Sequence, residues 1–273
     1  MNKYNVASIV TAALLIFAPA ASQAQLSLPV YEPFAYEPGT TSALVTLAPT
    51  TWTLTGANAL LTATVVSGSL PYSGLPAGTG NKVSLLNGAN FDDPGMDIVP
   101  ASGDGTSVYV SFILNVVNPG NTTGDYFLHV SSQGPTSTDF HSRFWIRQAS
   151  SASVFNVGTR NHTTAAGQVW GTTEYSVGTP LFVVVSYDFV SGTVNDTTRV
   201  WINPALGLGT PPSPTLTATA VAGDTDLASV GRINLRQGSG NTNLSVQVDE
   251  IRVSTNWTDV TPTNASVRDW TIY

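Results

Sequence analysis

The chain contains no cysteine, only three histidines and few charged residues, since Asp, Glu, Lys and Arg together make up 10% of its 273 residues. Without cysteine there is no disulfide framework, so the folded state must depend on a hydrophobic core, which a chain of this length can form. His129, His141 and His162 lie far apart and lack the spacing of a zinc site. No Gly-x-Ser-x-Gly segment occurs, which disfavours a serine nucleophile.

Basic residues are scarcer than acidic ones: 10 Lys and Arg stand against 17 Asp and Glu, a net charge of −7. Loss of residues 1–24 would remove Lys3 and leave 9 basic and 17 acidic residues, a net charge of −8. A protein with this charge is not expected to bind nucleic acid. Glutamate is rare as well, occurring only at positions 32, 37, 174 and 250.

The only long apolar run lies at the start of the chain. Lys3 precedes the run at residues 9–18, and Ser22-Gln23-Ala24 supplies small residues at a cleavage site, which predicts a secretory signal peptide over residues 1–24. The run is shorter than the roughly 20 apolar residues of a membrane-spanning helix. We therefore expect a secreted or periplasmic protein with no membrane span in the mature chain, one domain over residues 25–262 and a short tail over residues 263–273.

Thr, Ser, Asn, Gly and Val dominate what remains, and they favour strands and turns. Residues 107–117 alternate most clearly, because Val108, Val110, Phe112, Leu114 and Val116 fall on one face. About a dozen such segments separated by turns predict an all-β, two-sheet antiparallel sandwich. The expected strands cover residues 42–47, 60–66, 82–86, 107–117, 125–130, 140–147, 153–157, 181–190, 198–202, 215–221 and 230–237, followed by a terminal strand.

The terminal strand changes its alternation partway along. Val246 and Val248 share one parity, whereas Ile251 and Val253 share the other, so a regular strand cannot place all four on one face. A β-bulge at Asp249-Glu250 resolves this conflict. The bulge predicts two carboxylates in a mostly buried strand, where they must be paired, hydrogen-bonded or metal-bound.

Alternation also predicts which polar side chains point away from the core. In residues 140–147, Phe140, Phe144 and Ile146 are expected inward and His141 outward, on the same face as Arg143, Trp145 and Arg147. The acidic segment at residues 91–97 is expected to be a solvated loop that exposes its three aspartates. The outward residues that could bind a ligand are Arg143, Trp145, Arg147, Arg199, Trp201, Arg232, Asn234 and Arg236.

Several stretches, in order along the chain, resemble bacterial secreted laminin G-like domains of the concanavalin A-like lectin/glucanase superfamily. The resemblance covers nearly all of residues 25–262 and implies a jelly roll of two curved antiparallel sheets. The stretches are Tyr31-Glu32-Pro33-Phe34, residues 72–76, residues 80–83, residues 108–112, residues 181–184, Val200-Trp201-Ile202-Asn203-Pro204, and Asp249-Glu250-Ile251-Arg252-Val253 with Trp257.

Members of this superfamily include carbohydrate binders, adhesive modules, glycan hydrolases and lyases, so the fold constrains function loosely. Its glucanases carry Glu-x-Asp-x-x-Glu on one strand, and this chain has no such segment. We expect a non-catalytic, monomeric module that binds extracellular carbohydrate or a cell-surface or matrix component. The alternatives are a hydrolase or lyase with an unrecognised site, and a purely structural extracellular protein.

The resemblance also implies a possible calcium site. Superfamily members place the first and last strands side by side, which would bring Glu32 near Asp249 with backbone carbonyls to complete an oxygen shell. The alternative is that Asp249 and Glu250 bond to backbone amides, to Arg252 or to hydroxyls of turns.

The eight outward residues form one site only if their strands share the concave sheet. They would then line a groove in which tryptophan stacks on sugar rings and arginine binds hydroxyls or carboxylates. The alternative is that they cover the convex face, or that the arginines pair with aspartates such as Asp188.

Overall fold

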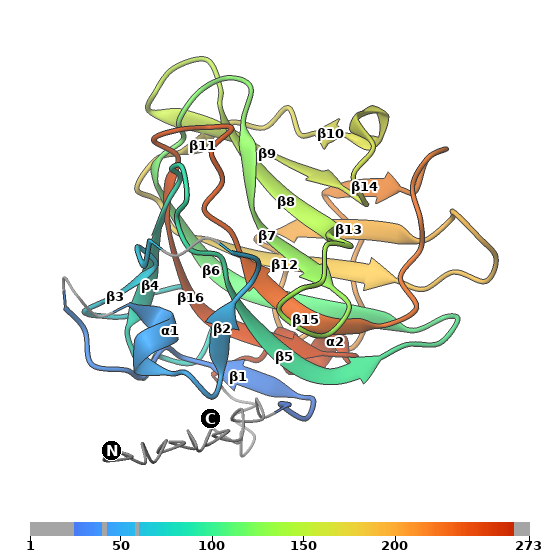
Figure 1. Ribbon diagram of the computed structural model, residues 1–273, viewed down its shortest axis with the longest axis horizontal. Coiled ribbons are helices and arrows are strands. Elements are labelled where there is room, and N and C mark those ends of the chain that lie inside the picture. Colours follow the sequence, from blue (N-terminus) through green and yellow to red (C-terminus); the bar gives the residue numbers. More distant parts are fainter. Residues whose placement is uncertain (1–24, 40–42, 58–59, 265–273) are drawn as a thin grey trace, which may run out of the picture.

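The computed structural model describes residues 25–39, 43–57 and 60–264, which fold into two antiparallel sheets packed face to face (Figure 1). The expected signal peptide and residues 265–273 lie outside the described residues. Sheet 1 has the strand order β14-β13-β12-β6-β16-β4-β3, and β1 also pairs with β16. Its strands are β1 (Val30–Glu32), β3 (Thr64–Val66), β4 (Lys82–Leu86), β6 (Ser107–Asn118), β12 (Leu181–Asp188), β13 (Thr197–Ile202), β14 (Leu216–Thr219) and β16 (Ser245–Ser254).

Sheet 2 has the strand order β10-β9-β8-β7-β15-β5-β2, and β11 also pairs with β9. Its strands are β2 (Trp52–Leu54), β5 (Pro94–Ala101), β7 (Asp125–Ser131), β8 (His141–Gln148), β9 (Val154–Arg160), β10 (Val169–Trp170), β11 (Tyr175–Ser176) and β15 (Val230–Leu235). The helices are short: α1 (Leu44–Leu47), η1 (Ala165–Gly167) and α2 (Trp257–Val260). The fold is therefore the all-β, two-sheet antiparallel jelly-roll sandwich that the sequence predicts.

The core lies between the sheets and follows the alternation of the strands. All five apolar side chains of one face of β6 are buried in it, as predicted. Phe112 of sheet 1 packs against Phe127 and Phe144 of sheet 2, with ring centroids 5.9 and 5.8 Å apart in edge-to-face arrangements. This aromatic contact fixes the two sheets against each other, because edge-to-face pairs add to the energy of area burial.

The outer face of sheet 1 is covered by a second hydrophobic cluster. Tyr109 and Trp201 lie on strands of that sheet, and Trp257 of α2 packs on both, with ring centroids 5.7 and 5.0 Å away. Leu70 and Leu75, from the loop at residues 69–78, complete the cluster. Loop and helix therefore occupy the outer face of sheet 1 that a ligand would need.

The bulge predicted in the terminal strand is confirmed. The pairing of β16 with β6 shifts register between Asp249 and Arg252, and Glu250 has a φ of 55°. Val248 and Ile251 consequently both reach the core although their parities differ. The carboxylates of the bulge are hydrogen-bonded: Asp249 accepts from Leu70 N at 2.6 Å, and Glu250 accepts from Arg252 Nη2 at 2.8 Å.

Two local predictions are wrong. Residues 44–47, expected within a strand, form the single helical turn α1, closed by the bond from Ala48 N to Leu44 O. The acidic segment is not a solvated loop, because Asp92 and Asp97 are buried and Asp97 lies on β5. Asp92 Oδ1 accepts hydrogen bonds from the backbone of residues 62 and 63 and from Gln237, which replace the hydration lost at that oxygen.

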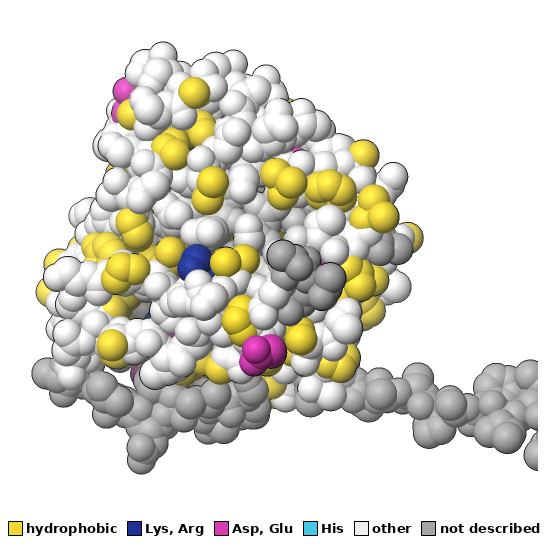
Figure 2. All heavy atoms as spheres, turned by 90° about the vertical axis from the view of Figure 1, so that its left-hand side faces the viewer, with side chains coloured by type: hydrophobic (Ala, Val, Ile, Leu, Met, Phe, Trp, Pro, Cys, Tyr) yellow, Lys and Arg dark blue, Asp and Glu magenta, His cyan; other side chains and the backbone are white. Residues whose placement is uncertain are grey.

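Charged side chains are sparse on the face drawn in Figure 2, where hydrophobic and neutral polar groups dominate. This matches a chain with 10% charged residues. Neither of the α-helices found in the described residues exceeds four residues, so none is long enough to cross a membrane.

Candidate functional site

The outer face of sheet 2 carries a row of aromatic side chains on neighbouring strands. Tyr126 of β7 lies opposite Trp145 of β8, with ring centroids 5.3 Å apart. Trp145 in turn lies opposite Gly158 of β9, and Trp170 of β10 pairs with the same glycine from the other side. A Cβ at Gly158 would collide with the ring of Trp170, so glycine is needed for this ring to lie on the strand. The two tryptophan rings are 6.2 Å apart and half-buried.

Four guanidinium groups stack on these rings. The Cζ of Arg143 lies 4.7 Å from the ring centroid of Tyr126, and that of Arg236 lies 4.1 Å from the same centroid. Arg160 stacks on Trp145 at 4.7 Å and Arg147 on Trp170 at 4.3 Å. We call this set the arginine–aromatic face: Tyr126, Arg143, Trp145, Arg147, Arg160, Trp170 and Arg236. Such a surface offers half-buried aromatic rings, guanidinium planes stacked on them and N–H donors for hydroxyl or anionic groups.

Two of the predicted ligand-binding residues on sheet 2 are instead buried in the protein's own network. Arg232 is fully buried and forms an ion pair with Asp97, Nη1 to Oδ1, at 2.6 Å. Its Nε donates to Asn234 Oδ1 at 3.0 Å, and Asn234 is also fully buried. Burial and pairing leave neither side chain available to an external ligand.

Arg199 and Trp201 lie on β13 of sheet 1 and therefore do not share a face with the other predicted residues. Trp201 is 1% exposed, and its Nε1 donates to Pro212 O at 2.8 Å. Arg199 pairs with Asp188 through Nε–Oδ2 at 2.6 Å, which is the alternative considered from the sequence. The prediction of one shared groove is wrong for these two residues, because alternation fixes the face of a strand but not its sheet.

The expectation that Glu32 and Asp249 come together around calcium is not met. Strand β1 does pair with β16, but Glu32 lies opposite Ile251, a core residue, and so points between the sheets. Its carboxylate accepts from Trp52 Nε1 at 3.0 Å and from Phe34 N at 2.6 Å. Asp249 faces the opposite side, where the loop residue Leu70 donates to it. Within the described ranges, no group of three or more His, Cys, Asp and Glu side chains could hold a metal.

The start of β8 departs from its predicted alternation. Ser142 has a φ of 45°, and this irregularity turns His141 inward and Phe140 outward, the reverse of the prediction. Phe140 then packs on His129, with ring centroids 4.4 Å apart. Both ring nitrogens of His129 are buried without a hydrogen-bond partner, and burial followed by the charge of Arg143 places its pKa well below the ordinary range. His129 is therefore a neutral ring beneath the arginine–aromatic face.

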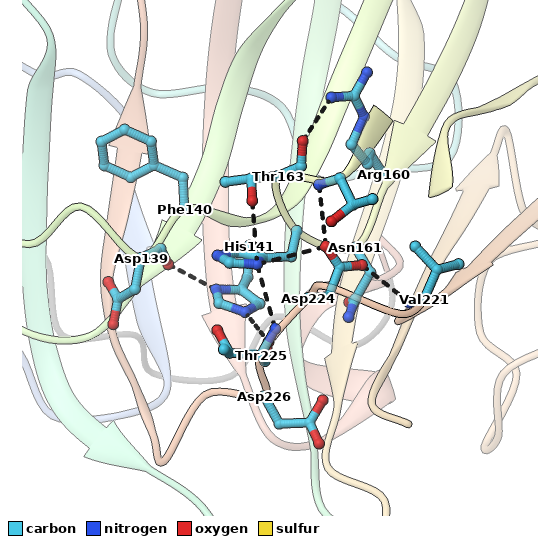
Figure 3. Close-up of polar contacts among 12 residues, drawn as sticks. Asp139, Phe140, His141, Arg160, Asn161, Thr163, Val221, Asp224, Thr225 and Asp226 are labelled. Atoms are coloured by element: carbon cyan, nitrogen blue, oxygen red, sulfur yellow. Dashed lines mark hydrogen bonds and ion pairs between the residues drawn. The ribbon is translucent and has the colours of Figure 1, made fainter. Parts of the chain in front are cut away.

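The inward-turned His141 stacks on His162, with ring centroids 4.0 Å apart, and packs edge-to-face against Tyr187 of sheet 1. Both nitrogens of His141 lie near carbonyl oxygens, Nδ1 at 2.7 Å from Asp139 O and Nε2 at 2.6 Å from Thr225 O (Figure 3). His162 Nδ1 lies 3.6 Å from Asp224 Oδ1. Burial, and then the charge of His141, lower the pKa of His162 to about 4, although Asp224 acts in the opposite direction.

This arrangement predicts a loss of stability in acid. Because the folded pKa of His162 lies below its ordinary value of 6.5, the unfolded chain binds more protons between pH 6.5 and about 4. The contribution of His162 to the free energy of unfolding is fully present above that window. It falls as the pH falls through the window, by up to about 1.4 kcal/mol per pH unit. In His162→Gln, urea unfolding measured across this window should show a shallower pH dependence than the wild type. The other groups that act on the pKa of His162 are Asp224, Asp139, His141 and Arg143. An unchanged slope in His162→Gln would contradict the assignment of the acid-dependent loss of stability to His162.

Two carboxyl groups lie at one end of the arginine–aromatic face. Asp125 accepts from Arg236 Nη1 at 2.8 Å, and Asp93 accepts from the backbone N of Gln237 at 2.7 Å. Burial raises the pKa of Asp93 to about 6, against the opposing effects of the Gln237 amide and Arg236. Glycoside hydrolysis uses a pair of carboxyl groups, one of which has a raised pKa.

Two surface cavities lie away from the arginine–aromatic face. One, of about 520 Å³, is lined by residues 69–78 and Asn264, and the other, of about 480 Å³, is lined by Pro38, Gly39 and residues 64–67. Neither is lined by a charged side chain. We place the candidate site on sheet 2 rather than in these cavities, because charged and aromatic side chains converge on that face, whereas neither cavity is lined by a charged side chain.

Three residues of the face were missed by the sequence analysis. Arg160 lies at the end of β9, three residues beyond the expected end of that strand, and continued alternation would have placed it outward. Tyr126 belongs to a strand whose pairing with β8 is irregular, so alternation alone is ambiguous there. Trp170 lies on a two-residue strand, which is too short to give any periodic signal.

No protein-family model matches this chain, and neither does any curated protein. Similar solved structures include a native heptameric pentraxin from Limulus polyphemus, with 14% identity, a TM-score of 0.41 and coverage of 64% of this chain and 76% of the pentraxin. Domain 4 of an extracellular arabinanase from Geobacillus stearothermophilus, solved in complex with arabinotriose, has 14% identity, a TM-score of 0.41 and coverage of 77% and 88%. A marine alginate lyase from Zobellia galactanivorans has 12% identity, a TM-score of 0.39 and coverage of 75% and 94%. Similarities of this size carry no argument about what this chain binds.

Proposed function

We propose that the protein is a secreted, non-catalytic jelly-roll module that binds extracellular carbohydrate on its arginine–aromatic face. The observation that supports this most is the pair of half-buried indole rings, Trp145 of β8 and Trp170 of β10, which lie on either side of Gly158 of β9 with a guanidinium group stacked on each. Aromatic rings bury much area at low entropic cost, and arginine supplies directed donors, which together suit a hydroxylated ring.

The test is a binding screen of the protein against immobilised neutral and acidic polysaccharides, with and without calcium, alongside a reducing-sugar assay on the same polymers. We expect saturable binding without release of sugar. Release of sugar would show that the protein is a glycan-degrading enzyme and would contradict the proposal of a non-catalytic module. Absence of binding and release from a folded protein would favour a purely structural role.

A second function, glycan hydrolysis, is favoured by one observation. Asp93, whose pKa burial raises to about 6, neighbours the arginine-paired Asp125 at the edge of the same face. In that case Asp93 would be the general acid. Asp93→Asn should then abolish sugar release while leaving binding intact, whereas the binding-module proposal expects no release from either form.

A further inference from the structure

Two arginines face each other directly across β8 and β9. The register pairs Arg143 with Arg160, and directly opposite side chains on one face of a sheet have Cβ atoms about 4.5–5.5 Å apart. Like charges in this position destabilise a sheet. Stacking of Arg143 on Tyr126 and of Arg160 on Trp145 offsets part of this repulsion.

The acceptors that hold these two guanidinium groups are neutral. Arg160 donates from Nε to Gln168 Oε1 at 3.0 Å. Its Nη1 donates to Thr163 O at 3.1 Å (Figure 3). Arg143 is 8% exposed and donates from Nε to Phe140 O at 3.2 Å, and no hydrogen bond joins its Nη atoms to the residues that the structure describes. Both groups are thus fixed in place with N–H donors still unused, and neither charge is neutralised.

The contrast with the other arginines is clear. Of the seven arginines in the described ranges, four have a carboxylate oxygen within 2.8 Å: Arg199, Arg232, Arg236 and Arg252. Within the same ranges, no carboxylate oxygen lies within ion-pair distance of Arg143, Arg147 or Arg160. The three unpaired arginines all lie on β8 and β9, on one face of one sheet. The other four described arginines are therefore paired with carboxylates, whereas the three on β8 and β9 are not.

We propose that Arg143 and Arg160, extended by Arg147, bind the carboxylate or sulfate groups of an acidic polysaccharide whose sugar rings lie on Trp145 and Trp170. This rests on the proposed carbohydrate-binding function and gives it a ligand class. A planar guanidinium matches an oxyanion with two parallel hydrogen bonds, and an anion between two facing arginines removes their mutual repulsion.

A polymer fits this row better than a small anion. Arg143 and Arg147 are four residues apart on one strand, which corresponds to about 13 Å at the usual rise per residue. One carboxylate cannot contact both ends of such a row, whereas charged groups on successive sugars can. The overall net charge of −7 makes general attraction of polyanions weak, so binding depends on these residues.

The test compares polymers that share a backbone and differ in charge. Polygalacturonate is compared with its methyl-esterified form, and dextran sulfate with dextran, by calorimetry at two salt concentrations. We expect the charged member of at least one pair to bind at least tenfold more tightly than its neutral counterpart, and more weakly at high salt. Carboxylate preference and sulfate preference are told apart by which pair responds.

The variant Arg160→Gln should weaken binding of the charged polymer at least tenfold, and Arg199→Gln, on the other sheet, is the matched control with the same change in net charge. At a polymer concentration about 100 times the Kd, the wild type should unfold about 5–10 °C higher than without polymer, and Arg160→Gln should lose most of that shift. Equal binding of neutral and charged polymers, unaffected by Arg160→Gln, would overturn the acidic-glycan inference and leave carbohydrate binding standing. An equal loss in Arg199→Gln would overturn it in favour of general charge attraction. Absence of binding to every polymer would overturn both proposals.

Discussion

Arg232→Met is expected to lower the free energy of unfolding by about 3–5 kcal/mol, because removing one member of a buried ion pair leaves the other charge uncompensated. The guanidinium of Arg232 is fully buried and bonds to Asp97 Oδ1 at 2.6 Å, Thr53 O at 2.9 Å and Thr55 Oγ1 at 3.1 Å. Methionine fills a similar volume but satisfies none of these acceptors. The change is measured by urea unfolding followed by circular dichroism at neutral pH.

Two further variants separate the loss of the charge pair from the loss of packing. Arg147→Met removes a half-buried arginine that has no carboxylate partner, so it should cost less than about 1 kcal/mol. The double variant Arg232→Met/Asp97→Leu should recover a large part of the stability, since replacing a whole buried pair by apolar groups is often nearly neutral. If Arg232→Met were no less stable than Arg147→Met, the buried pair of Arg232 on β15 and Asp97 on β5 would not contribute to stability.

Arg232 also shows what the sequence could and could not predict. Its outward direction follows from alternation, because Ile233 and Leu235 point to the core. Its partner Asp97 lies 135 residues away on β5, and the register that brings them together depends on the whole sheet. Burial of Asp97 was missed for the same reason, since a run of aspartates near a Pro-Gly pair has the local composition of a solvated loop.

The terminal strand was predicted in more detail because its signal is local. A change of parity between Val248 and Ile251 requires an extra residue, and that residue is Glu250. The irregularity at Ser142 could not be predicted in this way, because the aromatic Phe140 and His141 can occupy either face of a sheet and leave no change in the apolar pattern. A bulge is predictable where it rescues an apolar pattern, and it is hidden where the flanking residues are amphipathic.

Assignment of strands to sheets limited the prediction of the site. The groups on β8 and β13 have the same outward Arg-x-Trp pattern, with Arg143 and Trp145 on one strand and Arg199 and Trp201 on the other. Only the tertiary pairing shows that β13 lies in sheet 1, where loop 69–78 and α2 cover the second tryptophan. The tryptophan of this motif is therefore half-buried on sheet 2 and fully buried on sheet 1.

Trp145→Ala is expected to weaken carbohydrate binding about 30-fold or more, which corresponds to about 2 kcal/mol and is typical of an aromatic anchor in an interface. The ring is the centre of the arginine–aromatic face: Tyr126 and Trp170 lie 5.3 and 6.2 Å away, and Arg160 stacks on it at 4.7 Å. Its Nε1 has no hydrogen-bond partner in the described part of the chain, so truncation breaks none of the hydrogen bonds found there. The readout is the Kd for a polysaccharide identified in the binding screen.

Trp145→Phe is the conservative control, because it keeps a flat ring on β8 and should retain most of the affinity. Arg199→Ala should leave the Kd unchanged, since that side chain pairs with Asp188 on the other sheet. Thermal unfolding of each variant verifies that the loss of affinity does not follow from loss of structure.

If a folded Trp145→Ala variant bound as tightly as the wild type, the sugar would have to contact another surface, and the cavity formed by residues 69–78 would become the next site to test. Loss in Trp145→Ala with retention in Trp145→Phe would instead assign binding to ring stacking on sheet 2, because these two variants differ only in the aromatic surface that they present.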